Sequence, residues 1–314
     1  MGFRVSTSAA FMFFRRNIGL ANERQARIAE QMATGKRVNL PSDDPLAAQS
    51  IAGFREANQR VASYQRNVTM ADNRWKMIES DLGSANEVLV RAKELAIQGN
   101  NGTLSAPQRA QIAQEVSQLS KQFLSISNRQ IDGEYIFGGY RTNAAPFAQD
   151  GAFPNANPAV SYAGDPNVKQ VQIGENEWID IQVSGGRVFK GSGVNGGVDP
   201  FQALAKLEQA LLNNNTTNSD PASVGQALDD LNKAIEQVIG EMANTGAISN
   251  RLDSLKASLT TQSNLNTEFI SQNEDIDLAE AAYEFQRAQI VLQATVSSAS
   301  AILNRPSLMD FIGR

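Results

Sequence analysis

The sequence predicts a mainly α-helical protein with a β-rich insertion: a long antiparallel helical rod, terminal helices paired as a coiled coil, and a small outer β domain. Two observations support this fold class. Four long stretches carry apolar residues at alternating steps of three and four, which is the pattern of the buried seam of a supercoiled helix. Between them, residues 142–220 are rich in glycine, proline and asparagine and contain short alternating segments, which is typical of strands joined by turns.

The first helical stretch covers residues 5–34. One polar residue, Gln25, interrupts its seam, and Gly35 marks its end. Apolar residues extend beyond a single stripe, so we expect this helix to be buried on several sides in an assembly. Arg15 and Arg16 argue against insertion into a membrane. The residues expected to contact other helices are Phe11, Phe14, Ile18 and Ile28.

The stretch that organises the rod runs from Pro45 to Gln98. Asp44 is suited to accept hydrogen bonds as the N-cap, Pro45 fits the first turn, and Gly99 ends the helix. Ser50 alone breaks the apolar row, so a helix of roughly 80 Å needs partners along its whole length. The residues expected in the rod core, including two from a returning helix, are Phe54, Val61, Trp75, Leu82, Leu231 and Leu252.

A second rod helix is expected from Ser105 to about Gln130, opened by a capping box of Ser105 and Gln108. Because the connection is short, this helix should fold back antiparallel on the first. Within the insertion, strands are expected over residues 168–173, 178–183 and 188–189. A short helix should begin at Asp199 and end near Leu212.

Helix resumes after Asp220, and a last helix runs from about Asp277 to Leu303, where Pro306 prevents its continuation. This last helix repeats apolar residues every seven positions, as a coiled-coil strand does. The residues expected at its contacts are Leu278, Phe285, Leu292 and Ile302.

A chain that leaves the rod, forms a small domain and returns brings its two ends together, so the first and last helices should pair. We expect a terminal coiled-coil domain made of residues 1–40 and 270–314. The helical rod domain should comprise residues 41–141 and 221–269, and the β-rich outer domain residues 142–220.

The composition excludes several classes of function. The 314 residues include no cysteine and no histidine, which removes disulfides, thiolate chemistry, imidazole bases and the usual zinc ligands. A formal net charge of −5 without a basic stripe argues against binding to nucleic acid. No apolar run approaches the roughly 18 residues that a membrane helix needs. We expect no enzyme activity, no catalytic residues, no cofactor, no metal and no membrane insertion.

Three motifs could suggest catalysis or ligand binding, but each has a structural explanation. Asp43 and Asp44 are adjacent acids, but the N-cap role explains Asp44 without catalysis. The acids between Glu274 and Glu280 could bind a metal, but acids in a first helical turn are favoured by the helix dipole. GSGVNG at 191–196 matches G-x-G-x-x-G, but neither a βαβ unit nor a helix at the third glycine accompanies it, which indicates a flexible loop.

Three motifs, far apart and in order, resemble the bacterial flagellin superfamily. The run MATGKRVNLPSDDPLAA (32–48) is similar to the N-terminal signature, and GAISNRLDSL (246–255) to the returning rod helix. DIDLAEAAYEFQRAQIVLQATVSSASAIL (275–303) is similar to the C-terminal signature. Within the superfamily, GEYIFGGYRTNAAPF (133–147) resembles the members that join the hook to the filament.

The resemblance implies a structural protein of the bacterial flagellum, exported through the flagellar type III apparatus without a cleaved signal. It implies help from an export chaperone and extracellular self-assembly into a ring or tubular layer. Hook-associated protein 1 and flagellin would be the neighbours on the two sides. A short filament flagellin is the alternative, which residues 133–147 disfavour. An enzyme carried by the insertion and a soluble coiled-coil binding module are the other classes of function.

Overall fold

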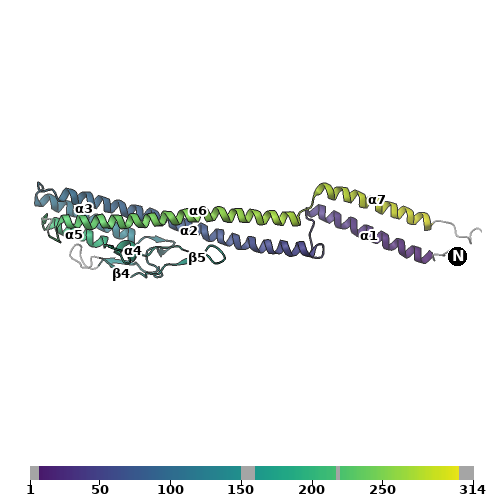
Figure 1. Cartoon of the computed structure of the whole chain (residues 1–314), viewed down its shortest axis with the longest axis horizontal. Helices are drawn as coiled ribbons and strands as arrows, with labels where there is room; N and C mark the ends of the chain where they lie inside the picture. The colour runs from purple at the N-terminus through teal and green to yellow at the C-terminus, as the bar shows by residue number, and fades with distance from the viewer. Residues whose placement is uncertain (1–6, 150–159, 217–219, 304–314) are drawn as a thin grey trace, which may run out of the picture. The chain divides into compact units, whose positions relative to one another are not determined.

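The structure is a computed structural model that describes residues 7–149, 160–216 and 220–303, with side chains described between residues 11 and 301 of these ranges. Helices dominate the described part (Figure 1). In chain order the helices are α1 (Thr7–Thr34), α2 (Pro45–Gly99), α3 (Ala106–Ser127), α4 (Gly185–Lys190), α5 (Pro200–Leu212), α6 (Val224–Glu274) and α7 (Leu278–Leu303). The strands are β1 (Gln130–Ile131), β2 (Glu134–Tyr135), β3 (Phe147–Gln149), β4 (Val160–Tyr162), β5 (Gln170–Gln172) and β6 (Trp178–Asp180).

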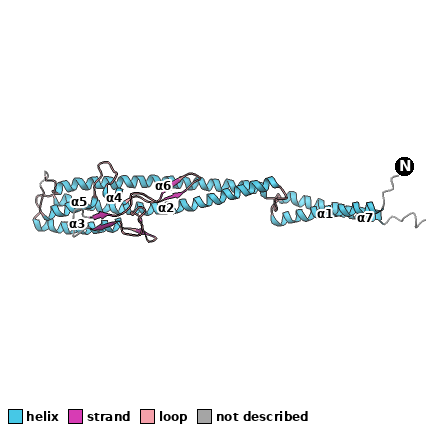
Figure 2. Cartoon of the chain, turned by 90° about the horizontal axis from the view of Figure 1, so that it is seen from below, coloured by secondary structure: helices cyan, strands magenta, loops and turns pink. Residues whose placement is uncertain are grey.

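Contacts divide the chain into two compact units. One unit consists of Met1–Arg60 and Gln262–Arg314, and the other of Val61–Thr261. The long helices α2 and α6 contribute residues to both units. The predicted fold class is confirmed, because the protein is mainly helical (Figure 2). Helices α2 and α6 pair antiparallel, and so do α1 and α7. The short β-hairpins lie between α3 and α4 in the sequence.

The helical core of the Val61–Thr261 unit follows the apolar row predicted for α2. Every seam position of α2 from Val68 to Ala96 is at most 3% exposed. The predicted core residues in this unit lie in one cluster with those of α3 and α6: Val61, Trp75, Leu82, Leu231 and Leu252. Phe54 belongs to the other unit, where its ring is half-buried and stacks on Phe269 with 5.1 Å between the ring centroids.

The beginning of α3 has the predicted capping interaction. The Ser105 N–H donates to Oε1 of Gln108 at 2.9 Å, which satisfies one of the free amides at the helix start. Helix α3 ends at Ser127, shortly before the predicted end, and β1 begins at Gln130. Arg91 of α2 and Glu115 of α3 form an ion pair at 2.7 Å across the antiparallel pair.

The insertion consists of small hairpins rather than one sheet. In its described part, β3 pairs with β4 and β5 with β6, each antiparallel and two-stranded, and β1 pairs with β2 just before it. The predicted strands at 168–173 and 178–183 are confirmed in shorter form as β5 and β6. The hairpins β1–β2 and β3–β4 were not predicted, because strands of two or three residues are too short to show alternation.

The prediction of a strand at Val188–Phe189 is wrong, because these residues lie in helix α4. Both side chains are fully buried, at 0% exposure. Consecutive residues of a strand point to opposite faces, whereas a helix held on two sides can bury both. Gly191, with a φ of 64°, ends the helix in the left-handed conformation that glycine adopts without strain.

The insertion shares its hydrophobic core with the rod helices. Phe189 lies among four other buried phenylalanine rings, one of which, Phe123, comes from α3. Two side chains of α2 also hold the β5–β6 hairpin, since Trp75 Nε1 and Asn67 Nδ2 each donate to a main-chain carbonyl of that hairpin at 2.7 Å. The predicted helix at Asp199 is confirmed as α5, with Asp199 accepting from the amide of Phe201 at 2.9 Å.

One buried carboxylate in this core provides a test of its electrostatics. Glu208 of α5 is 6% exposed, and its Oε2 has no hydrogen-bond partner within the described ranges. Burial raises the pKa of Glu208, and this effect outweighs the opposing influence of Ser117 and Lys121. A carboxyl with a raised folded-state pKa binds its proton more tightly in the folded protein, so its contribution to stability falls as the pH rises.

We therefore expect Glu208→Met to raise the melting temperature at neutral pH by about 2–4 °C, which corresponds to about 1 kcal/mol in a unit of this size. The gain should shrink as the pH falls toward 4, because the raised pKa of Glu208 favours its protonated form in the folded protein. Thermal unfolding followed by circular dichroism at both pH values measures the difference. Gln209→Met, at the exposed neighbouring position, is the control. A pH-independent gain for Glu208→Met would contradict the electrostatic explanation.

Candidate assembly interface

The inner seam of the terminal helices is built from small residues. Ala281, Ala288 and Ala299 of α7 are 5–6% exposed and allow the helix to lie close to α1, where Ile28 is 8% exposed. Arg24 of α1 pairs with a carboxylate oxygen of α7 at 2.6 Å. Larger side chains border the seam and are half-buried: Phe14, Ile18, Phe285 and Leu292.

The outer faces of the same two helices are apolar and uncovered. Their large apolar side chains are between 47% and 67% exposed: Phe11, Met12, Phe13, Leu20, Leu278, Tyr283, Ile290, Val291 and Val296. Scattered apolar residues are ordinary on a protein surface, but so many on two adjacent helices mark a surface that another molecule covers. We name these nine residues the outer apolar face.

The predicted contact residues are therefore split between two surfaces. Phe11 and Leu278 belong to the outer apolar face, at 51% and 59% exposed, and Leu278 is the first residue of its helix. The side chain of Ile302 lies outside the described side chains. Met12, Tyr283, Ile290 and Val291 lie outside the heptad seam and were therefore not predicted as contact residues, although their apolar side chains are visible in the sequence.

An ion cluster around the buried Glu274 lies where the terminal helices connect to the ends of α2 and α6, within the Met1–Arg60 and Gln262–Arg314 unit. Glu274, the last residue of α6, is 4% exposed. Its two carboxylate oxygens pair with Lys36 Nζ at 2.5 Å and with Arg55 Nη2 at 2.6 Å. Its main-chain carbonyl accepts from the amide of Arg37 at 2.6 Å, and the Ile276 amide donates to Gly35 at 3.1 Å.

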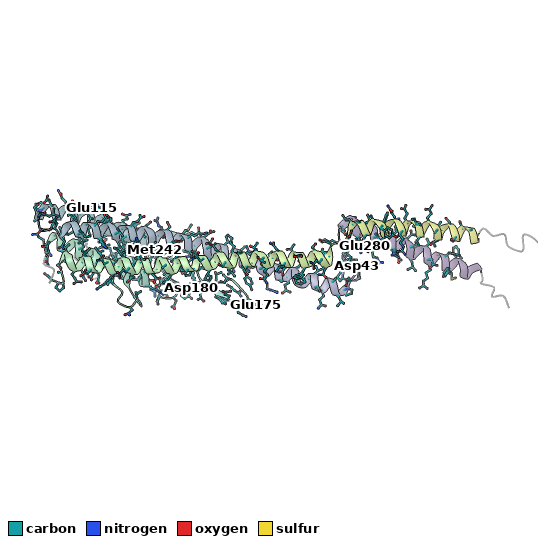
Figure 3. The ribbon with its side chains drawn as sticks, turned by 45° about the horizontal axis from the view of Figure 1, so that its top comes forward. Asp43, Glu115, Glu175, Asp180, Met242 and Glu280 are labelled. Atoms are coloured by element: carbon teal, nitrogen blue, oxygen red, sulfur yellow. The ribbon has the colours of Figure 1, made fainter. Side chains whose placement is uncertain are left out.

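The acidic residues that could suggest catalysis or metal binding make hydrogen bonds or ion pairs that stabilise the helix ends and the loop before α2. Asp44 caps α2 by accepting from the amide of Ala47 at 3.1 Å, and this bond, with the Arg37 guanidinium, lowers the pKa of Asp44. Asp43 accepts from the amides of the preceding loop, and Asp277 caps α7. Figure 3 labels Asp43 and Glu280 in this region. No group of three or more potential metal ligands occurs within the residues that the structure describes.

The GSGVNG motif forms a loop between α4 and α5, as expected from its context. Gly191, Gly193 and Gly196 all have positive φ angles between 64° and 76°. The helix that follows begins only at Pro200, so the third glycine does not open a helix that could bind a phosphate group.

The ion cluster around Glu274 can be tested by substitution. We expect Glu274→Gln to weaken both ion pairs while keeping the side-chain shape, so the amides of Val38 and Ile276 should exchange with solvent about five- to tenfold faster. Hydrogen exchange read by mass spectrometry measures this change. Glu268→Gln, at an exposed position of the same helix, is the control. Equal exchange in the two variants would show that the cluster does not hold the connection.

The geometry of the described helices is that of a protein that assembles with other chains. Long paired helices carry an uncovered apolar face, and no described helix is long and apolar enough to cross a membrane. Such a chain is a structural protein that completes its burial by assembling with other chains.

The chain belongs to the bacterial flagellin family. The family's N-terminal helical region matches residues 5–142, and its C-terminal helical region matches residues 228–312, so the two matches span most of the chain. Membership identifies a structural component of the flagellum rather than an enzyme.

The chain is similar to flagellar hook-associated protein 3 of Escherichia coli, at 27% identity over 307 residues, covering 93% of this chain and 94% of that protein. It is also similar to hook-associated protein 3 of Salmonella typhimurium, at 28% identity and 78% coverage of both chains. Among solved structures, the flagellar junction protein FlgL of Legionella pneumophila matches with a TM-score of 0.60 at 16% identity, covering 72% of this chain and 100% of that one. The structural likeness shows a shared fold.

Proposed function

We propose that this protein is the subunit that joins the flagellar hook to the filament. The observation that carries this proposal is the similarity to hook-associated protein 3 of Escherichia coli over 93% of the chain, including the insertion. The run GEYIFGGYRTNAAPF at 133–147 supports the same function, because it resembles the junction members of the superfamily. We place hook-associated protein 1 on one side and flagellin on the other, with an export chaperone as a partner before assembly.

The mechanism of assembly is burial of the outer apolar face. In the isolated chain α1 and α7 cover one another on one side only, so each added subunit can remove large apolar side chains from water. The inner residues Phe14, Ile18, Ile28, Phe285 and Leu292 hold the pair together, while Phe11 and Leu278 face the neighbours. We propose that residues 1–40 and 270–314 form the terminal coiled-coil domain of the subunit. Residues 41–141 and 221–269 form the helical rod domain, and residues 142–220 form the outer domain.

A short filament flagellin is the second candidate function. The flagellin of Bacillus subtilis is 23% identical and covers 92% of both chains, so similarity to flagellins extends over the same length. Residues 133–147 favour the junction function because their sequence resembles the junction members of the superfamily.

Electron microscopy of cells lacking this protein tests the proposal. The junction layer forms once per flagellum and the filament grows on it, so loss of its subunit should leave hooks without filaments while flagellin is secreted into the medium. Restoring the wild-type chain should restore filaments. Cells that keep hooks with attached filaments, or that lose only the bulk filament protein, would contradict the junction function and favour the filament function.

A further inference from the structure

The glycine-rich loop between α4 and α5 contains a chemically reactive pair that the proposed function does not use. The chain has two Asn-Gly pairs, Asn101-Gly102 and Asn195-Gly196. In such a pair the main-chain nitrogen of glycine can reach the asparagine side chain, because no Cβ shields it. We propose that Asn195 is a site of spontaneous deamidation and that the fold protects Asn101 from the same reaction.

The reaction needs only water and hydroxide. The amide nitrogen of Gly196 loses its proton to hydroxide and attacks Cγ of Asn195, so that a new C–N bond closes a five-membered imide. The bond between Cγ and Nδ2 breaks as Nδ2 takes a proton from water, so the side-chain nitrogen leaves as ammonia and hydroxide is regenerated. Water then opens the imide at either carbonyl, which gives aspartate or isoaspartate.

The surroundings of Asn195 leave this reaction unhindered. Asn195 is exposed, and its side chain makes no hydrogen bond to the described residues. The Gly197 amide donates to the carbonyl of Val194 at 3.0 Å, which places Asn195 and Gly196 at the centre of a tight turn. Gly196 has a φ of 70°, and no atom lies within 4 Å of the position where a Cβ would be.

Asn101 is held in place by its neighbours. Its Oδ1 accepts from the amide and the hydroxyl of Thr103 at 3.1 and 3.0 Å. Its main-chain carbonyl accepts from Nη2 of Arg109 at 2.9 Å, and Arg109 is only 4% exposed. Turning Cγ toward the nitrogen of Gly102 breaks the bonds to Thr103, so we expect deamidation of Asn101 to be at least about tenfold slower.

Deamidation at Asn195 changes both charge and backbone in this loop. The loop borders a hollow lined by two cations, Arg187 and Lys233, and two acids, Glu236 and Glu241, so a new carboxylate adds one negative charge to a balanced set. Isoaspartate also adds a methylene carbon to the main chain, which lengthens the turn that the Gly197 amide and the Val194 carbonyl close. We expect the deamidated loop to carry one more negative charge and a less tightly closed turn.

Mass spectrometry of one digest tests the proposal on the full-length protein. After incubation in warm, mildly alkaline buffer, trypsin releases Asn195 in the peptide 191–206 and Asn101 in the peptide 94–109. We expect the amide-to-acid mass increase, and labelling by isoaspartyl methyltransferase, to accumulate at least about tenfold faster in the first peptide. Equal rates, a faster reaction at Asn101, or no change in either peptide would overturn the proposal.

Two variants separate the structural explanation from the sequence motif. Thr103→Ala removes the hydroxyl bond to Asn101 Oδ1 and keeps the bond from the main-chain amide, so it should accelerate deamidation at Asn101 by about three- to fivefold while leaving Asn195 unchanged. Asn195→Gln should abolish the signal from peptide 191–206, which shows that no other residue of that peptide produces it. If Thr103→Ala leaves Asn101 as slow as before, the bond from the Thr103 hydroxyl does not provide the protection.

Discussion

Replacing Phe285 and Leu292 together by alanine is expected to give a folded, exported protein that holds few or no filaments. Both side chains are half-buried in the contact between α1 and α7 and lie one heptad apart. Truncation of a fully buried Phe or Leu costs about 2–5 kcal/mol, and a half-buried one costs less. The core of the Val61–Thr261 unit does not include these residues, so its melting temperature should stay within about 2 °C of wild type.

Assembly magnifies this loss because every subunit repeats the same contact. A reduction of about 1.4 kcal/mol per subunit lowers each association constant tenfold, so the number of attached filaments should fall by at least about tenfold. Filament counts by electron microscopy and the amount of secreted protein should be measured in the same cells. The amount of secreted protein distinguishes failed assembly from reduced export, which would result if the proposed export chaperone bound the variant more weakly.

The matched control is Gln286→Ala with Gln293→Ala, which has the same heptad spacing on the exposed side of α7. These two polar side chains belong neither to the inner seam nor to the nine residues of the outer apolar face, so the control should keep normal filament numbers. Normal filaments on the Phe285→Ala and Leu292→Ala protein would show that this seam does not support the assembly.

The long helices could be predicted because their burial follows local periodicity. Each seam position from Val68 to Ala96 in α2 is buried, and the caps at Asp44, Ser105 and Asp199 act as their residue types indicate. Helix periodicity is repeated over many turns, so a single polar residue does not hide it.

The insertion was less predictable because its order depends on contacts distant in sequence. Val188 and Phe189 favour a strand by composition, yet the other phenylalanine rings around them impose a helix that buries both. The outer apolar face was partly missed for a different reason. Heptad analysis selects one stripe per helix, whereas α7 carries a second apolar surface, including Tyr283 and Ile290, that the isolated chain leaves exposed.

The aromatic cluster also shows how strongly the insertion depends on the rod. The Phe189 ring lies 4.9 Å from that of Phe137, 5.4 Å from Phe123 and 5.5 Å from that of Phe147, each in an edge-to-face arrangement. Phe123 belongs to rod helix α3, and all these rings are at most 2% exposed. Substitutions in the core of the insertion should therefore lower the stability of the rod helices.

We expect Phe189→Ala to lower the melting temperature of the Val61–Thr261 unit by roughly 10 °C. Removal of a buried phenylalanine costs about 3–5 kcal/mol, because the lost burial and the remaining cavity both destabilise the folded state. For a unit of this size each kcal/mol corresponds to about 2–4 °C. Phe189→Leu, which fills most of the volume but loses the edge-to-face contacts, should lie between the alanine variant and wild type.

Thermal unfolding by near-ultraviolet circular dichroism measures the effect, since the loss of ordered aromatic packing is its direct signal. Tyr140→Ala is the control, because Tyr140 is an aromatic residue of the same region that is 56% exposed and should change the free energy of unfolding by less than about 0.5 kcal/mol. If Phe189→Ala and Tyr140→Ala melt at the same temperature, the insertion contributes little to the stability of the rod, and its core is separate from that of α3. A much lower melting temperature for Phe189→Ala than for Tyr140→Ala means that the insertion forms part of the hydrophobic core of the rod. Removal of residues 142–220 would then expose Phe123 to water.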